Sequence, residues 1–256
     1  MKELHPTFGI YGIPQTPFDE RGEVDYASLA RGVDDRLTAG VDGLLVPVVA
    51  SEVGKLDDHE RRSIIAAVLR QVGGRVPVII GASSPDPRIA RDTAAYGTDL
   101  GAAGACVQAP TTMMRDKPEL RRYFDVVCEA PMAMLMIQDL EWNGPGLPVA
   151  TIRTLFEEVE AFRCIKVETS PAGPKYTEII EATGGRLNVS GGWAVTQLIE
   201  ALDRGVHAMM AGGLHWILVE VVRRYRTGDR SAARERPGVA CGETCIRPRE
   251  RQASRR

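Results

Sequence analysis

This chain has little net charge and few lysines. Its 32 basic and 34 acidic residues leave a formal net charge of −2 at pH 7, so we expect neither a nucleic-acid partner nor attraction to a membrane surface. No apolar run approaches the length of a membrane span, and the N-terminus lacks the apolar segment of a signal peptide. The five cysteines are an odd number, and those in apolar runs are expected to be free thiols. These absences favour a cytoplasmic protein.

Motifs for several kinds of chemistry are also missing. The chain has no G-x-S-x-G turn of a serine hydrolase and no G-x-G-x-x-G turn of dinucleotide binding. The four histidines show no metal-ligand spacing, and Cys241 and Cys245 lack both the usual zinc spacing and a histidine partner. We therefore expect no metal and no cofactor.

What the chain does have is an alternation of short apolar runs with stretches of helical period. The runs are about 20 to 34 residues apart, as strand–helix–strand units require. They begin near Gly9, Gly43, Val76, Gly104, Ala133, Phe162, Leu187 and Ala208. Asp57 and Glu60 form the pattern of a helix-capping box, and Pro148 suits a first helical turn. Eight such units predict a (β/α)₈ TIM barrel over residues 1–225, with an open doubly wound sheet as the alternative.

Residues 226–256 differ from the rest of the chain. They are rich in arginine, glycine, proline and serine and show no convincing helical stripe. A segment of this composition cannot bury enough apolar surface to fold alone. We expect a disordered tail that follows the barrel.

Lys166 is the most informative residue. It stands inside an apolar run, whereas Lys2, Lys55, Lys117 and Lys175 lie in polar surroundings by sequence. Burial of an ammonium costs free energy and favours the neutral amine, which attacks carbonyl carbons to form a Schiff base. The alternative is a structural lysine whose stem packs while its head reaches water. Alternation along a strand would place Phe162, Cys164, Lys166 and Glu168 on one side.

The barrel prediction gathers other polar residues around Lys166, because barrel active sites lie at the carboxyl ends of the strands. Each of these residues alone is more often a turn or cap residue, so their convergence is the signal. The residues that follow the strands are Thr16, Ser51, Glu52, Ser83, Thr111, Thr112, Gln138, Asp139, Ser190, Gly191 and Gly192.

Four segments resemble the dihydrodipicolinate synthase/N-acetylneuraminate lyase family: residues 12–18, 40–46, 77–82 and the pair Ile165-Lys166. The resemblance runs from about Phe8 to Arg224. It implies a class I lyase on a TIM barrel, with pyruvate or another 2-oxo acid bound as a Schiff base on Lys166 and an aldehyde as second substrate. It also implies a homotetramer or dimer. The backbone amides around Ala50 and the Ser51 hydroxyl would hold the carboxylate of the 2-oxo acid.

The chain departs from the family at several positions. Gln138 stands where the synthases usually have a proton-relaying tyrosine, and glutamine cannot titrate near neutrality. Val49-Ala50 replaces a pair of threonines, and Thr111-Thr112 replaces an aromatic pair. No arginine occurs in residues 141–146, where the family usually pairs one with the second substrate's carboxylate. These departures argue against lysine biosynthesis and favour an aldolase or dehydratase with another second substrate, for which Gln138 would position water.

Two other functions stay open. The glycine pairs Gly191-Gly192 and Gly212-Gly213 could bind the phosphate of a sugar phosphate, although glycine pairs also serve close packing. Loss of the tyrosine would also suit a barrel without catalytic activity that binds a small acid.

Overall fold

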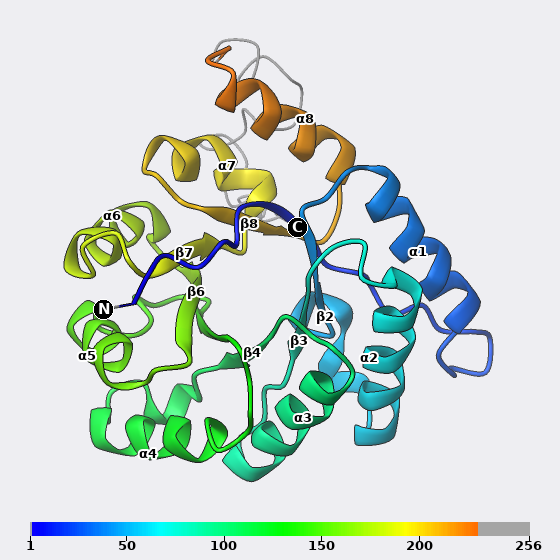
Figure 1. The fold of residues 1–256 in the computed structure, drawn as a ribbon, viewed down its shortest axis with the longest axis horizontal. Coiled ribbons are helices and arrows are strands. Elements are labelled where there is room, and N and C mark those ends of the chain that lie inside the picture. Colours follow the sequence, from blue (N-terminus) through cyan, green and yellow to red (C-terminus); the bar gives the residue numbers. More distant parts are fainter. Residues whose placement is uncertain (1, 230–256) are drawn as a thin grey trace, which may run out of the picture.

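A computed structural model describes residues 2–229 and shows eight parallel strands closed into a barrel in chain order (Figure 1). The prediction of a (β/α)₈ TIM barrel is confirmed. The strands are β1 Gly9–Gly12, β2 Gly43–Val46, β3 Val78–Gly81, β4 Gly104–Gln108, β5 Leu135–Glu141, β6 Phe162–Thr169, β7 Asn188–Gly191 and β8 Ala208–Ala211. Each begins within a few residues of its predicted position.

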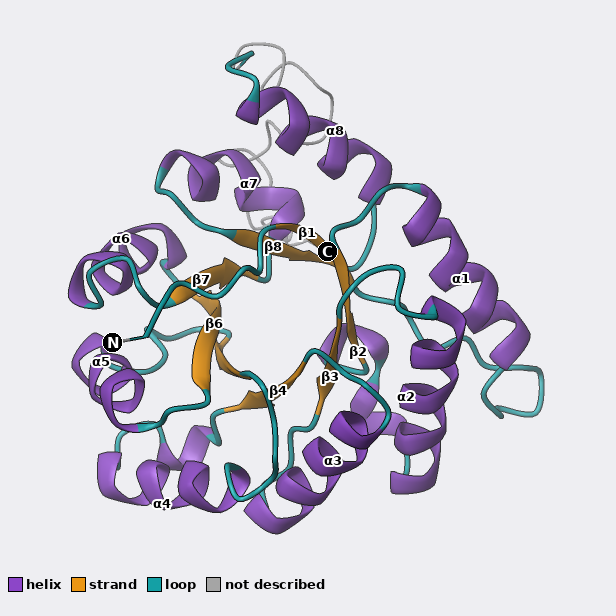
Figure 2. Cartoon of the chain, in the orientation of Figure 1, coloured by secondary structure: helices purple, strands orange, loops and turns teal. Residues whose placement is uncertain are grey.

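A helix follows each strand and packs on the outside of the barrel (Figure 2). The helices are α1 Tyr26–Thr38, α2 Asp58–Val72, α3 Pro87–Asp99, α4 Lys117–Val127, α5 Val149–Glu158, α6 Ala172–Ala182, α7 Ala194–Asp203 and α8 His215–Arg226. Short 3₁₀ turns lie at Val49–Ser51 (η1), Val53–Lys55 (η2) and Thr111–Met113 (η3). The Asp57–Glu60 capping box is present in both directions, and Pro148 is the N-cap of α5.

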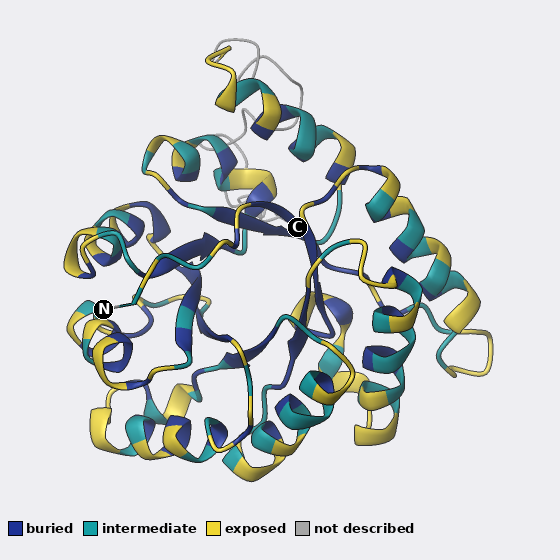
Figure 3. Cartoon of the chain, viewed as in Figure 1, coloured by how far each residue is buried: buried dark blue, intermediate teal, exposed yellow. Residues whose placement is uncertain are grey.

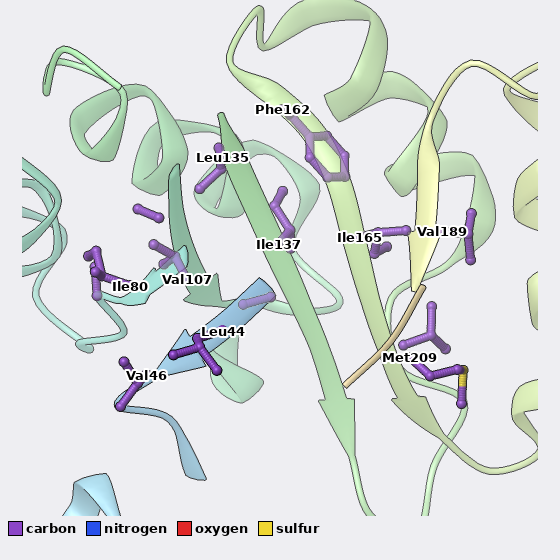
Figure 4. Close-up of a cluster of buried hydrophobic side chains, with 14 of the residues drawn as sticks. Leu44, Val46, Ile80, Val107, Leu135, Ile137, Phe162, Ile165, Val189 and Met209 are labelled. Atoms are coloured by element: carbon purple, nitrogen blue, oxygen red, sulfur yellow. The ribbon is translucent and has the colours of Figure 1, made fainter. Parts of the chain in front are cut away.

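Two apolar layers hold the barrel together. The larger layer lies between the strands and the surrounding helices, and Figure 4 shows part of it, including Leu44, Ile80 and Ile137. The smaller layer contains only residues on or beside strands, and alternation assigns it to the barrel interior. It consists of Tyr11, Ile13, Leu45, Val48, Ile79, Cys106, Met134, Met136, Cys164, Ala208 and Met210. Burial on both faces explains why the strands are continuously apolar (Figure 3).

The expected alternation along β6 is wrong at one position. Leu135 of β5 pairs with Phe162, but Met136 pairs with Cys164, so the register slips by one residue at Arg163. Because of this bulge, Phe162 packs in the outer layer with Ile165 and not beside Cys164 (Figure 4). Beyond the bulge the alternation is regular, and Lys166 keeps its inward direction.

The N-terminal segment lies against the amino ends of β6 and β7. The side-chain amide of Asn188, the first residue of β7, donates to the carbonyl oxygens of His5 and Thr7 at 3.0 and 2.7 Å. The Thr7 hydroxyl lies 3.6 Å from the Cys164 sulfur, near the start of β6.

The described chain ends close to the predicted boundary of the barrel. Helix α8 runs to Arg226, and the predicted tail lies almost wholly outside the described residues. Within residues 2–229, Cys106, Cys128 and Cys164 are free thiols. None of the described helices has the length and apolar character needed to cross a membrane.

Candidate active site

Lys166 lies on β6 inside the barrel and is only 2% exposed. Its Nζ is 3.0 Å from Oε2 of Glu168, which lies two residues further along the same face of the strand. A buried ammonium is tolerated only where a partner offsets its lost hydration, and Glu168 provides that partner. Strand alternation predicts Glu168 on the side of Lys166, but nothing in the sequence alone indicates a role for it.

Gln138 completes a group of three side chains. It is the residue of β5 that pairs with Lys166 in the barrel, and its Nε2 donates to Oε2 of Glu168 at 2.5 Å. One carboxylate oxygen therefore accepts from both the amine and the amide. The three residues meet because β5 and β6 are the longest strands of the described barrel and extend together into its mouth.

The floor beneath this group is apolar. Cys106, Met136 and Cys164 belong to the interior layer, and burial raises the pKa of the Cys106 thiol to about 12, although the charge of Lys166 opposes the shift. Cys106 is thus a neutral, protonated neighbour at physiological pH. Because the floor offers no further charge, Glu168 is the anion that faces Lys166.

Gly191 and Gly192 lie beside the carboxylate. A Cβ built on Gly192 would be 2.0 Å from Oε1 of Glu168, and one on Gly191 would be 2.5 Å from the Tyr176 hydroxyl. The space that these glycines leave is therefore filled by neighbouring side chains. Close packing accounts for both glycines, and an anionic phosphate at Gly192 would meet the charge of Glu168.

Thr16 and Ser51 connect the loops that follow β1 and β2. The Thr16 hydroxyl donates to the Ser51 carbonyl at 2.6 Å, and the Ser51 hydroxyl donates to the Pro14 carbonyl at 2.7 Å. Both side chains are buried. The amides of Ser51 and Glu52 donate to backbone carbonyls of the same turn. These hydroxyls hold the η1 turn, with Ala50 exposed on it, in a defined position at the mouth of the barrel.

Thr111 and Thr112 are exposed on the η3 turn. They line a hollow of about 350 Å³ together with Ser83 and Gln108. Neither Lys166 nor Glu168 is among the residues that line it. Gln108, which also lines this hollow, pairs with Gln138 on β5.

Lys175 was expected in polar surroundings, and this is wrong. It is only 7% exposed, and its Nζ lies 2.5 Å from Oδ2 of Asp139, which is fully buried. Burial lowers the pKa of Lys175 and raises the pKa of Asp139, while their mutual attraction opposes both shifts. The sequence misleads because α6 turns Lys175 toward the barrel, a direction set by tertiary packing.

Lys2 was also expected in polar surroundings, and it too is partly buried. Its Nζ lies 4.8 Å from the centre of the Phe156 ring, and it donates to the carbonyls of Phe156 and Val159 at 2.5 Å. Partial burial lowers its pKa.

Asp139 also lies away from the predicted ring around Lys166. It follows Gln138 on β5 and so points to the opposite side of the strand. Its Oδ1 accepts from the Leu147 amide at 2.7 Å, and Lys175 also donates to the Pro145 carbonyl. The Asp139–Lys175 pair thus anchors the loop of residues 142–148, which joins β5 to α5.

A second ion pair holds the same loop from outside. Arg115 Nη2 lies 2.9 Å from Oε2 of Glu141, and its Nη1 donates to the Gly146 carbonyl at 2.7 Å. The Gly146 amide donates to the same Glu141 oxygen at 2.7 Å. These interactions lower the pKa of Glu141. Arg115 is therefore engaged by the protein's own carboxylate.

No three His, Cys, Asp or Glu side chains within residues 2–229 are arranged as ligands of a metal ion. His59, on the first turn of α2, is exposed as expected for the start of a surface helix.

Comparisons with known proteins identify the family of the chain. The model of the dihydrodipicolinate synthetase family matches residues 6–237. L-2-keto-3-deoxyarabonate dehydratase of Azospirillum brasilense is 29% identical over 227 residues, covering 86% of this chain and 73% of that protein. The 4-hydroxy-tetrahydrodipicolinate synthase of Nitratidesulfovibrio vulgaris is 27% identical over 229 residues, covering 88% of this chain and 78% of that protein.

A solved structure is similar over the same region. YagE, a prophage protein of the dihydrodipicolinic acid synthase family from E. coli K12, was determined in complex with pyruvate. It matches with a TM-score of 0.81 at 26% identity, over 90% of this chain and 78% of that chain.

The buried pair under the loop gives a stability prediction. Lys175→Met leaves the Asp139 carboxylate buried without its cation, so it should lower the free energy of unfolding by about 3–5 kcal/mol. The double variant with Asp139→Asn should recover much of this loss, because neither charge remains. Urea denaturation measures both. Lys55→Met, which removes an exposed ion pair with Glu52, is the control and should change stability by less than about 1 kcal/mol. A single variant as stable as the control would contradict the anchoring role.

Proposed function

The chain belongs to the dihydrodipicolinate synthetase family, and we propose that it is a lyase whose Lys166 forms a Schiff base with pyruvate or another 2-oxo acid. One observation carries the proposal: a buried amine inside the barrel lies 3.0 Å from a carboxylate that can exchange its proton. Nucleophilic amines with an adjacent acid–base group are the usual means of attacking a ketone. The complex of YagE with pyruvate, noted above, supports the class of first substrate.

In the proposed mechanism, Glu168 accepts a proton from the Lys166 ammonium, and the neutral amine attacks the ketone carbon of the 2-oxo acid. A carbon–nitrogen bond forms, and a proton passes from the attacking nitrogen to the former ketone oxygen, which becomes a hydroxyl. Glu168 returns its proton to this hydroxyl, which leaves as water and yields an iminium. All three proton transfers are within reach of one carboxylate at hydrogen-bond distance from the amine.

The second half of the reaction uses the iminium as an electron sink. Loss of a proton from C3 gives an enamine. The enamine either attacks an aldehyde to form a carbon–carbon bond or expels a hydroxide from C4, which takes up a proton to leave as water. Glu168 is the group we assign to these proton transfers, and Gln138 orients it by donating to Oε2. A carboxylate thus takes the role that the family's tyrosine would otherwise have, since the amide of Gln138 cannot titrate.

The binding of the substrate carboxylate remains a proposal. We assign it to the backbone around Ala50, on the η1 turn that Thr16 and Ser51 hold in place. The Ser51 hydroxyl donates to the Pro14 carbonyl, so it supports the substrate carboxylate only indirectly, by holding this turn. Thr111 and Thr112 remain candidates for the second substrate, through the hollow that they line. Members of this family are typically oligomers that act on small molecules, and we propose a dimer or tetramer here.

Among the reactions of the family, we favour dehydration or aldol cleavage of a sugar-derived 2-oxo acid. The relative from A. brasilense is named a dehydratase of such an acid, and the loop after β5 contains no arginine for a second carboxylate. The alternative of a sugar phosphate is less favourable, because Gly192 borders the Glu168 carboxylate.

Borohydride trapping tests the Schiff base. Incubation with pyruvate and sodium borohydride should add one reduced adduct, and peptide mapping should locate it on Lys166. Intact mass and tandem mass spectrometry make the measurement, with Lys166→Met as the unlabelled control. An adduct on Lys175, or none with pyruvate or any longer 2-oxo acid, would contradict the proposal. A thermal shift without an adduct would indicate a barrel that binds the acid without reacting.

A coupled assay with pyruvate and aspartate semialdehyde tests the choice of second substrate. We expect kcat/KM below about 10⁴ M⁻¹s⁻¹, the lower end of the usual enzymatic range. The reason is that residues 142–148 contain no arginine and Arg115 is engaged by Glu141. Loss of a charge-assisted pair typically costs about 1.5–3 kcal/mol. The synthase of N. vulgaris serves as the positive control. Turnover comparable to that control would show that this chain recruits another cation.

A further inference from the structure

Two tryptophans stack on each other after the strands that flank β6. The ring centres of Trp142 and Trp193 are 6.3 Å apart, and the ring planes are inclined by 24°. Trp142 nevertheless keeps 62% of its surface exposed. The pair is therefore an aromatic surface that is partly open to solvent.

The order of the strands places this pair beside the candidate active site. Trp142 is the first residue after β5, and Trp193 follows β7 by two residues. Strand β6 lies between β5 and β7, so two rings that meet from both sides must cross the carboxyl end of β6. This is the strand that carries Lys166 and Glu168. Gly192, directly before Trp193, borders the Glu168 carboxylate.

The pair is also held in place. Asp139 and Lys175 anchor the loop that carries Trp142 from the inside, and Glu141 and Arg115 anchor it from the outside. Neither segment 142–148 nor segment 192–199 contains a lysine or an arginine. An anionic group next to the tryptophans would find no cation on these segments and would meet the charge of Glu168. Broad apolar rings without cations suit the C–H faces of an uncharged, hydroxylated carbon chain, and their indole N–H groups remain donors for its hydroxyls.

We propose that Trp142 and Trp193 form the wall that receives the substrate beyond its 2-oxo acid group, and that this wall selects an uncharged polyhydroxylated chain. The inference rests on the proposed Schiff base at Lys166 for its position in the reaction. The wall accounts for selectivity where the family would otherwise use an arginine. It makes Trp142 and Trp193 specificity-determining residues, and neither takes part in proton transfer.

Trapping with two acids of different length tests the wall. The concentration that half-saturates adduct formation is measured for pyruvate and for L-2-keto-3-deoxyarabonate, and their ratio is compared between variants. Trp142→Ala and Trp193→Ala should each shift the ratio against the longer acid by about 3- to 10-fold, as expected for loss of one stacking face. Trp193→Phe should keep the ratio close to its wild-type value. Trp216→Ala, which removes another exposed tryptophan, should leave the ratio within about twofold.

Tryptophan fluorescence separates the wall from the Schiff base. Titration of the wild-type protein with the longer acid should quench the emission, and Trp142→Ala should remove most of the quenching. Quenching without any borohydride adduct would overturn the Schiff base but support the wall. An unchanged ratio in both alanine variants, or a stronger effect of the variants on an aminated analogue than on the hydroxylated acid, would overturn the wall as proposed.

Discussion

The site depends on one constraint, which is that a lysine ammonium buried in an apolar barrel needs a counter-charge within hydrogen-bond distance. Lys166 finds it in Glu168, one step along the same face of β6, and Gln138 on the neighbouring strand adds a donor to the same oxygen. An ion pair in low dielectric gains little net stability over apolar packing. Its presence at the mouth of a barrel is therefore better explained by chemistry than by stability. The same proximity that offsets the burial also allows proton transfer.

Strands β5 and β6 organise both the site and its surroundings through alternation. Inward residues Gln138, Lys166 and Glu168 form one hydrogen-bonded group, whereas Asp139 points outward to Lys175. Two buried ion pairs thus lie on opposite sides of adjacent strands. One contains the amine and the carboxylate of the proposed mechanism, and the other holds the loop that carries Trp142. A change in the packing of α6 would therefore alter the position of this loop at the mouth of the barrel through the Asp139–Lys175 pair.

Much of the fold could be predicted from the sequence because its signals are local. The eight apolar runs, the Asp57–Glu60 capping box and the amphipathic helices depend only on neighbouring residues. Lys166 stood out because a charge within an apolar run is rare. The burial of Lys175 could not be predicted, since it depends on where α6 lies against β5. The position of Phe162 also could not, because a bulge leaves no clear mark in the residues that form it.

The role proposed for Glu168 was not predicted from the sequence. Its position two residues after Lys166 was visible in the sequence, and alternation alone placed it on the same side. What the sequence did not reveal was that Gln138, which lacks the tyrosine's acidity, would direct an amide at that carboxylate. The pairing register of β5 and β6 brings them together.

The most direct test of this account is the exchange of the C3 protons of pyruvate with deuterium, monitored by proton NMR in D₂O. Exchange requires both the Schiff base and a group that removes the C3 proton. Wild-type protein should exchange these protons and Lys166→Met should not. Glu168→Gln should form the borohydride adduct only on long incubation, because Glu168 also serves the proton transfers at the amine, and should exchange the C3 protons about 10²- to 10⁴-fold more slowly. Exchange at the wild-type rate in Glu168→Gln would show that the carboxylate is only structural, and no exchange in the wild-type protein would contradict the enamine itself.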